Sequence, residues 1–144
     1  MKFSDKFIKN QIERFRPLAE KSGLGFTRAA QDKFGRLIHF LCRKKVVVNE
    51  MDFDGVPGAI VVPRDESRSG IILYLHGGGF VTGGLDYAKG FAAMLSSECG
   101  MRVACCAYSL APESPFPAAV NDSLTAYKYL LSHGYSADSI LHRR

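Results

Sequence analysis

The sequence lacks a long apolar run, although hydrophobic residues occupy 47% of its 144 positions. A membrane-spanning helix needs about 18 to 20 consecutive apolar residues, so no transmembrane segment is predicted. The start of the chain, Met1–Lys6, also lacks the apolar centre and the small-residue cleavage site of a signal peptide. We therefore expect a globular chain without an export signal.

The sequence also lacks cysteines at the spacings of a zinc site, and we expect no metal. Without an export signal, its four cysteines are expected to be reduced thiols in the cytoplasm. Cys105 and Cys106 are adjacent within an apolar run, so they should point to opposite faces of a strand. Buried packing is the expected role for most of these thiols.

Acidic residues are scarce at the start of the chain. Residues 1–45 contain 12 Lys and Arg but only 4 Asp and Glu, whereas residues 46–144 contain 7 and 10. A basic segment of this kind can attach to nucleic acid or to an anionic membrane. We favour the alternative of helices with solvated basic faces, and we expect no nucleic-acid partner.

Two amphipathic helices are predicted within residues 1–45, because apolar residues recur there every three or four positions. The Ser22–Gly25 segment interrupts the pattern, and the second helix ends near Arg43. The apolar positions are Phe3, Phe7, Ile8, Ile12, Phe15 and Leu18 in the first helix, and Phe34, Leu37, Ile38 and Leu41 in the second.

From residue 46 the apolar pattern changes from helical to extended. Val46–Phe53 and Ala59–Val62 are predicted to form a hairpin with a turn at Gly55–Gly58. Ile71–Leu75 is an unbroken apolar run, as in a buried parallel strand, and Val103–Tyr108 is another.

A helix is predicted after each of these two apolar strands. Asp86 is the predicted N-cap of the first helix, which reaches Cys99, and Gly100 is placed to end it. The second helix is predicted to have Pro117 in its first turn and to continue through Leu131. Alternation of strands and helices indicates the α/β class, with a parallel sheet and right-handed crossovers.

A glycine-rich loop, His76–Phe80, directly follows the first apolar strand. Three consecutive glycines carry no Cβ atoms, so backbone N–H groups can approach a ligand closely. Acyl transfer needs such donors, because the attacked carbonyl oxygen becomes an oxyanion. A phosphate-binding loop would instead need a following Lys-Ser or Lys-Thr pair or the dinucleotide glycine spacing, and Phe80–Thr82 offers neither.

Three motifs together resemble the hormone-sensitive-lipase-like family of α/β-hydrolases, in particular its bacterial acetyl esterases. The motifs are His76–Phe80, Tyr108–Glu113 and Pro115–Ala119. The resemblance covers about residues 50–140 and implies the N-terminal portion of an α/β-hydrolase fold, with about four strands and crossover helices. Residues 1–45 would then be two cap-like helices, and residues 46–144 the incomplete hydrolase domain.

The resemblance implies roles for the residues of the glycine loop. Gly78 and Gly79 would be the oxyanion donors, and Gly77 would shape the turn. His76 is expected to orient the loop through hydrogen bonds, since the catalytic histidine of nucleophile-elbow hydrolases lies far downstream. Phe80 completes the supporting loop.

Phe80, Tyr87 and Phe116 are candidates for an acyl pocket, with ordinary core or rim packing as the alternative for each. Glu113 and Asp122 are expected to be structural acids. Ser109 stands where the family usually has arginine, which removes a positive charge that could pair with nearby acids.

No serine of this chain has a glycine two residues before it and two after it, so the family's nucleophile elbow is absent. The resemblance implies that nucleophile, acid and base are all outside this chain, which would end just before the nucleophile and be inactive alone. The strand Ile71–Leu75 would then be an open apolar edge, prone to self-association or to pairing with a complementary chain.

The function implied by the resemblance is hydrolysis of short-chain carboxylic esters by a serine nucleophile. The substrates would be small esters, amide cleavage stays open, and no cofactor is implied. Three alternatives remain: half of a split hydrolase, a non-catalytic ligand-binding relative such as the plant gibberellin receptors, and attachment to membranes or nucleic acid through the basic helices.

Overall fold

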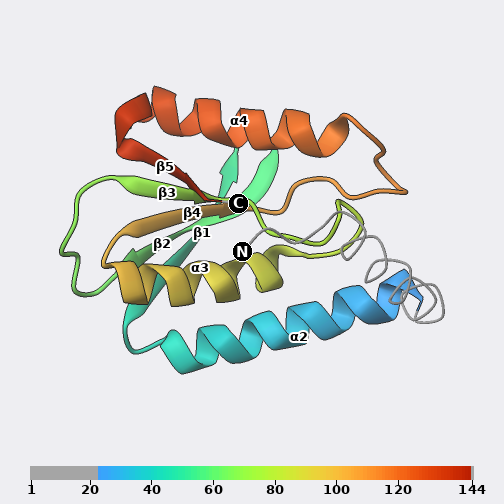
Figure 1. Ribbon diagram of the computed structural model, residues 1–144, viewed down its shortest axis with the longest axis horizontal. Helices are drawn as coiled ribbons and strands as arrows, with labels where there is room; N and C mark the ends of the chain where they lie inside the picture. The colour runs from blue at the N-terminus through green and yellow to red at the C-terminus, as the bar shows by residue number, and fades with distance from the viewer. Residues whose placement is uncertain (1–22, 144) are drawn as a thin grey trace, which may run out of the picture.

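Five strands form a mixed sheet with helices on both faces (Figure 1). The computed structural model describes residues 23–143. The strands are β1 (Val46–Phe53), β2 (Val56–Pro63), β3 (Ile71–Tyr74), β4 (Arg102–Cys106) and β5 (Ile140–Arg143). They lie in the order β1-β2-β4-β3-β5. Strand β3 runs parallel to β4 and β5, whereas β2 pairs antiparallel with β1 and β4. The predicted α/β class and the parallel crossovers are confirmed.

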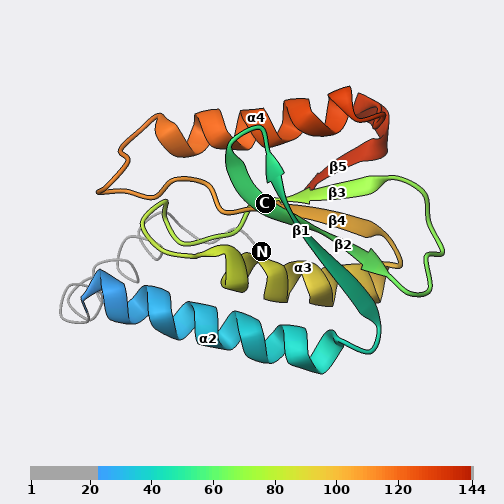
Figure 2. The same cartoon turned by 180° about the vertical axis from the view of Figure 1, so that it is seen from behind.

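The helices are α2 (Leu24–Cys42), α3 (Leu85–Cys99) and α4 (Ala118–Ser132), and a 3-10 turn, η1 (Ala137–Ser139), precedes β5. Helix α4 covers one face of the sheet and α3 the other, with α2 packed outside α3 (Figures 1 and 2). Helix α2 confirms the second predicted amphipathic helix. The first predicted helix lies outside the described residues.

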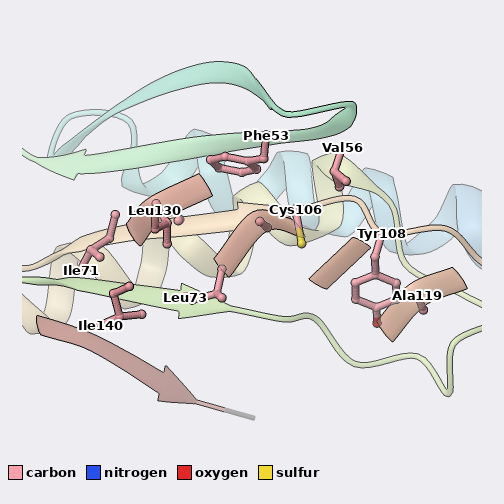
Figure 3. Close-up of a cluster of buried hydrophobic side chains, with 11 residues drawn as sticks. Phe53, Val56, Ile71, Leu73, Cys106, Tyr108, Ala119, Leu130 and Ile140 are labelled. Carbon is pink, nitrogen blue, oxygen red and sulfur yellow. The ribbon is translucent and has the colours of Figure 1, made fainter. Parts of the chain in front are cut away.

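The hydrophobic core has two parts, one on each face of the sheet, because successive strand residues point to opposite faces. On the α4 side, Leu73 and Cys106 pack with Leu130 (Figure 3). On the α3 side, Ile72 and Cys105 belong to the second buried cluster. The prediction of opposite orientations for the two adjacent cysteines is therefore confirmed. Burial raises the pKa of both thiols to about 12, which keeps them protonated as apolar packing groups.

The hairpin turn is tighter than the sequence pattern predicted. Strand β2 begins at Val56, and only Asp54 and Gly55 separate it from β1. Both turn residues have positive φ, 54° and 96°, and Asp52 Oδ1 accepts a hydrogen bond from Gly55 N. The predicted four-residue turn at Gly55–Gly58 was wrong, because an Asp-Gly pair readily adopts the positive φ angles of a two-residue hairpin turn.

Helix α3 begins two residues earlier than predicted. Gly84 holds the N-cap position without a side-chain bond, so the prediction of Asp86 as N-cap was wrong. The Asp86 carboxylate lies in the first turn instead, 2.8 Å from Lys89 Nζ, where a negative charge still favours the helix. At the other end, Gly100 adopts the left-handed conformation, φ 64°, which confirms its predicted role.

The apolar strand β3 is paired on both sides, with β4 and with β5. Our expectation that Ile71–Leu75 forms an open edge was therefore wrong. Strand β5 supplies four residues, which matches the whole length of β3. Within the described residues, β1 and β5 are the edges. Self-association through a sheet edge, the presence of a complementary chain and the division of the chain at residue 45 stay predictions.

Two glycines allow α2 to approach α3 closely. A Cβ atom at Gly35 would overlap the carbonyl oxygen of Asp86, and one at Gly90 would overlap the backbone of Gly35. We expect Gly35→Ala to lower the free energy of unfolding by about 1–3 kcal/mol, because the obstructing atoms are backbone and cannot move aside. Urea denaturation measures this change. The control is Gly25→Ala, in the same helix with open space around it, and an equal loss in both variants would contradict the prediction.

Candidate functional site

The glycine loop leaves the carboxyl end of β3 and leads into α3. Ligands of α/β sheets commonly bind at this edge. Three consecutive residues have positive φ: Gly78 at 140°, Gly79 at 61° and Phe80 at 63°. Such a conformation is rare for a bulky side chain and concentrates at functional sites. Phe80 therefore combines an unusual backbone conformation with an exposed aromatic ring.

The loop folds back on the carbonyl oxygen of Gly78. This oxygen accepts hydrogen bonds from Val81 N and Thr82 N, both at 3.1 Å, and from Thr82 Oγ1 at 3.2 Å. By contrast, the N–H groups of Gly77, Gly78 and Gly79 have no acceptor among residues 23–143. Within the described part of the chain, the loop thus fixes its own carbonyl and leaves a run of backbone donors without a protein acceptor.

His76 is buried at the base of the loop, with 4% of its surface exposed. Its Nδ1 lies 3.0 Å from the carbonyl oxygen of Gly77 and 3.2 Å from the hydroxyl of Tyr108. That hydroxyl also donates to the carbonyl oxygen of His76, and the two rings stack with centroids 4.1 Å apart. A Cβ at Gly83 would overlap the imidazole. The start of the loop is therefore tied to the residues that follow β4.

Burial lowers the pKa of His76 from its ordinary value, because the charged imidazolium would lose its hydration. As the pH falls below about 6.5, the imidazole therefore takes up a proton in the unfolded chain before it does so in the folded chain. We expect the free energy of unfolding to fall as the pH drops below that value, by at most about 1.4 kcal/mol per pH unit. Urea denaturation at several pH values measures the slope. The variant His76→Gln should lose this part of the slope, and an unchanged slope in it would contradict the assignment.

Two pockets adjoin the loop, and Phe80 lines both. The smaller, about 170 Å³, also has Phe116 in its wall, and the larger, about 460 Å³, includes His76. Tyr87 lines neither of them and instead makes an edge contact with His76, with ring centroids 6.1 Å apart. The remaining lining residues are Ala111, Ser114, Pro117, Ala119 and Val120 in the smaller pocket, and Leu75, Gly77, Tyr108, Val120 and Ser123 in the larger.

Our sequence reasoning missed Arg28, which α2 brings to the end of the glycine loop. Its Nε donates to the carbonyl oxygen of Val81 at 2.9 Å, and its Nη2 donates to that of Ala111 at 2.9 Å. The same guanidinium binds both carboxylate oxygens of Glu113, at 2.8 and 2.9 Å. This pairing lowers the pKa of Glu113 to about 2. The only signal in the sequence is an arginine on a predicted helix, and that does not identify its partner.

The second acid predicted to be structural, Asp122, lies in α4 and binds the start of the same turn. Its Oδ2 accepts a hydrogen bond from Ser109 N at 2.7 Å. At position 109 the chain therefore uses its backbone N–H to bind an acid. The guanidinium that binds this turn is that of Arg28, in α2.

Ser114 and Ser123 line the two pockets beside the loop, and within the described residues neither is hydrogen-bonded to a histidine. A serine and a histidine do meet elsewhere, where Ser132 Oγ lies 3.1 Å from His133 Nδ1. Both side chains are exposed at the end of α4, bond to the carbonyl oxygen of Tyr129, and line neither pocket. This pair is therefore a local contact at the end of the helix.

No described helix is both long enough and apolar enough to span a bilayer. No group of three or more His, Cys, Asp or Glu side chains among residues 23–143 could hold a metal ion. The cytoplasmic location stays a prediction.

Comparison with known sequences gives one family and several curated relatives. A family model described as the alpha/beta hydrolase fold matches residues 72–143, which is half of the chain. Esterase LipI of Mycobacterium tuberculosis is 37% identical over 79 residues, which are 55% of this chain and 25% of LipI. Ethyl acetate hydrolase of Pseudomonas putida is 42% identical over 71 residues, 48% of this chain and 22% of that enzyme. The chain thus spans about a quarter of these relatives.

Solved structures give the same picture over more of the chain. A crystal structure of EstE5 soaked with p-nitrophenyl butyrate superposes with a TM-score of 0.72 at 28% identity, covering 91% of this chain and 46% of EstE5. A hormone-sensitive lipase from a metagenome library superposes with a TM-score of 0.69 at 30% identity, covering 93% of this chain and 46% of the lipase. The chain spans less than half of each structure.

Proposed function

Because this chain belongs to the α/β-hydrolase fold family, we propose that it forms part of an enzyme that hydrolyses short-chain carboxylic esters. The observation that carries the proposal is the run of N–H donors at Gly77–Gly79, which lie at the carboxyl end of β3 and have no acceptor within residues 23–143. The names of the two relatives, an esterase and an ethyl acetate hydrolase, support the same reaction class.

In the proposed reaction, Gly78 and Gly79 donate their N–H groups to the substrate carbonyl oxygen as it becomes an oxyanion. Donors that are fixed in advance stabilise this charge without having to reorganise. The hydrogen bonds to the carbonyl oxygen of Gly78 provide that rigidity. His76 supports the loop through its contacts with Tyr108, and its burial keeps the imidazole neutral around pH 7.

The acyl group of the substrate is proposed to occupy the smaller pocket, between Phe80 and Phe116. This pocket is largely apolar and encloses about 170 Å³, which suits a short acyl chain. Tyr87 would contribute indirectly, by packing against His76 rather than by touching substrate.

The serine nucleophile, its acid and its base are proposed to come from residues outside this sequence. They would belong either to a further segment of the same polypeptide or to a second chain. No serine of residues 1–144 stands in a Gly-x-Ser-x-Gly elbow, which the family's chemistry needs. Gly78 and Gly79 would therefore serve a nucleophile that another segment contributes.

Two measurements test this proposal. Residues 1–144, purified alone, should hydrolyse p-nitrophenyl butyrate no faster than buffer, and turnover by this chain would contradict the assignment of the nucleophile. Sequencing the gene beyond the Arg144 codon should reveal a Gly-x-Ser-x-Gly elbow in one of the three frames. If no frame contains an elbow, and no co-purifying chain carries one, the ester-hydrolase proposal fails.

A further inference from the structure

The guanidinium of Arg28 joins three segments that are far apart in sequence: α2, the end of the glycine loop and the turn before α4. It makes four hydrogen bonds, one to Val81 O, one to Ala111 O and two to the Glu113 carboxylate. One quarter of the side chain is exposed. A planar guanidinium carries five N–H donors in a fixed fork, which allows one side chain to bridge several acceptors.

These contacts reach the proposed oxyanion donors within two hydrogen-bonded steps. Arg28 holds the carbonyl oxygen of Val81, and the N–H of the same residue donates to the carbonyl oxygen of Gly78. The preceding carbonyl oxygen, of Phe80, accepts a hydrogen bond from Ala111 N at 2.8 Å. The peptide between Phe80 and Val81 is thus held on both sides, and Arg28 also binds the carbonyl of Ala111.

We propose that Arg28 is a positioning residue, through which α2 sets the direction of the Gly78 and Gly79 N–H groups. This inference rests on the proposed function of those donors. Arg28 does not touch the substrate; it fixes the end of the loop relative to the turn that carries Glu113. The serine at position 109 adds no charge there, so the positive partner of Glu113 in the described structure comes from α2.

The arrangement requires arginine rather than positive charge alone. A lysine ammonium is a compact point charge, and it cannot reproduce the flat fork that spans two carbonyls and a carboxylate. The variant Arg28→Lys keeps the charge and should still lose the link between the two loops. The variant Glu113→Gln removes the ion pair but leaves both carbonyl contacts available, so it should disturb the loop less than either Arg28 variant.

Amide hydrogen exchange by NMR on the whole chain tests this proposal. In Arg28→Lys and Arg28→Met, the amides of Val81, Thr82 and Ala111 should exchange about 10- to 100-fold faster, as expected when charge-assisted hydrogen bonds are lost. Amides of β4 and of the middle of α3 should keep their rates. The matched control is Arg36→Met, which removes an exposed ion pair from the same helix, between Arg36 and Asp86 at 3.4 Å, and should leave the loop unchanged.

Two results would overturn the positioning role. One is that the loop amides of Arg28→Lys exchange as slowly as those of the wild type, which would mean that any positive charge at position 28 is sufficient. The other is faster exchange spread equally over α2, α3 and the loop, which would show only that the helix has undocked. Arg28→Lys decides the question even if Arg28→Met does not fold. Because exchange needs no substrate, failure of the ester-hydrolase proposal leaves this readout intact.

Discussion

Replacing Gly78 by alanine is expected to lower kcat for ester hydrolysis by about 100- to 1000-fold in the enzyme that combines this chain with its serine nucleophile. A Cβ at this position would overlap the carbonyl oxygen of Thr82, and the φ of 140° is one that L-residues rarely adopt. The loop must therefore rearrange, which turns the N–H groups of Gly78 and Gly79 away from the oxyanion. KM should change little, because the oxyanion forms only as the reaction proceeds.

The matched control for this experiment is Gly77→Ala. A Cβ at Gly77 would meet no atom within 4 Å, and its φ lies outside the left-handed region, so the loop can keep its shape. Steady-state kinetics with p-nitrophenyl butyrate should show a change of only a few-fold for this variant. If Gly78→Ala retained the wild-type kcat, or raised KM alone, the oxyanion assignment would be wrong.

The secondary structure that could be predicted from the sequence is the part that local patterns determine. Strand β3 is four consecutive apolar residues, and the apolar repeat of α2 follows the helical period closely. Strand β5 has no local pattern that would predict it, because Ile140–Arg143 is short and mixes apolar with basic residues. Its extended conformation depends on pairing with β3, a partner about 70 residues away. Non-local pairing of this kind leaves no periodic signal in the sequence.

The same distinction applies to the candidate site. The glycine loop is visible because its residue types and its place after a strand are both local features. The contact of Arg28 with Glu113 joins residues 85 positions apart and depends on how α2 packs over α3. That packing depends in turn on Gly35 and Gly90, which allow the two backbones to meet. The sequence pattern alone cannot show which helix faces will be brought together.

The largest loss of stability is expected for Phe53→Ala. Phe53 is completely buried (Figure 3). It packs edge-on against Tyr129, with ring centroids 5.2 Å apart. Its ring occupies the space above Gly58, where any Cβ would overlap it. Truncating a buried phenylalanine removes its transfer free energy and leaves a cavity, which together cost about 3–5 kcal/mol. Since small domains are stable by only about 5–15 kcal/mol, this loss alone can leave much of the population unfolded.

Urea denaturation followed by circular dichroism measures this effect, and Val47→Ala provides the control. Val47 lies on the same strand, β1, but is 40% exposed, so its truncation should cost less than about 1 kcal/mol. The difference between the two variants isolates burial from strand propensity, because both remove a β-forming residue from one strand. Similar midpoints for the two variants would mean that Phe53 does not anchor the hairpin to α4. The packing of α4 on its face of the sheet would then depend on the buried residues of β3 and β4 alone.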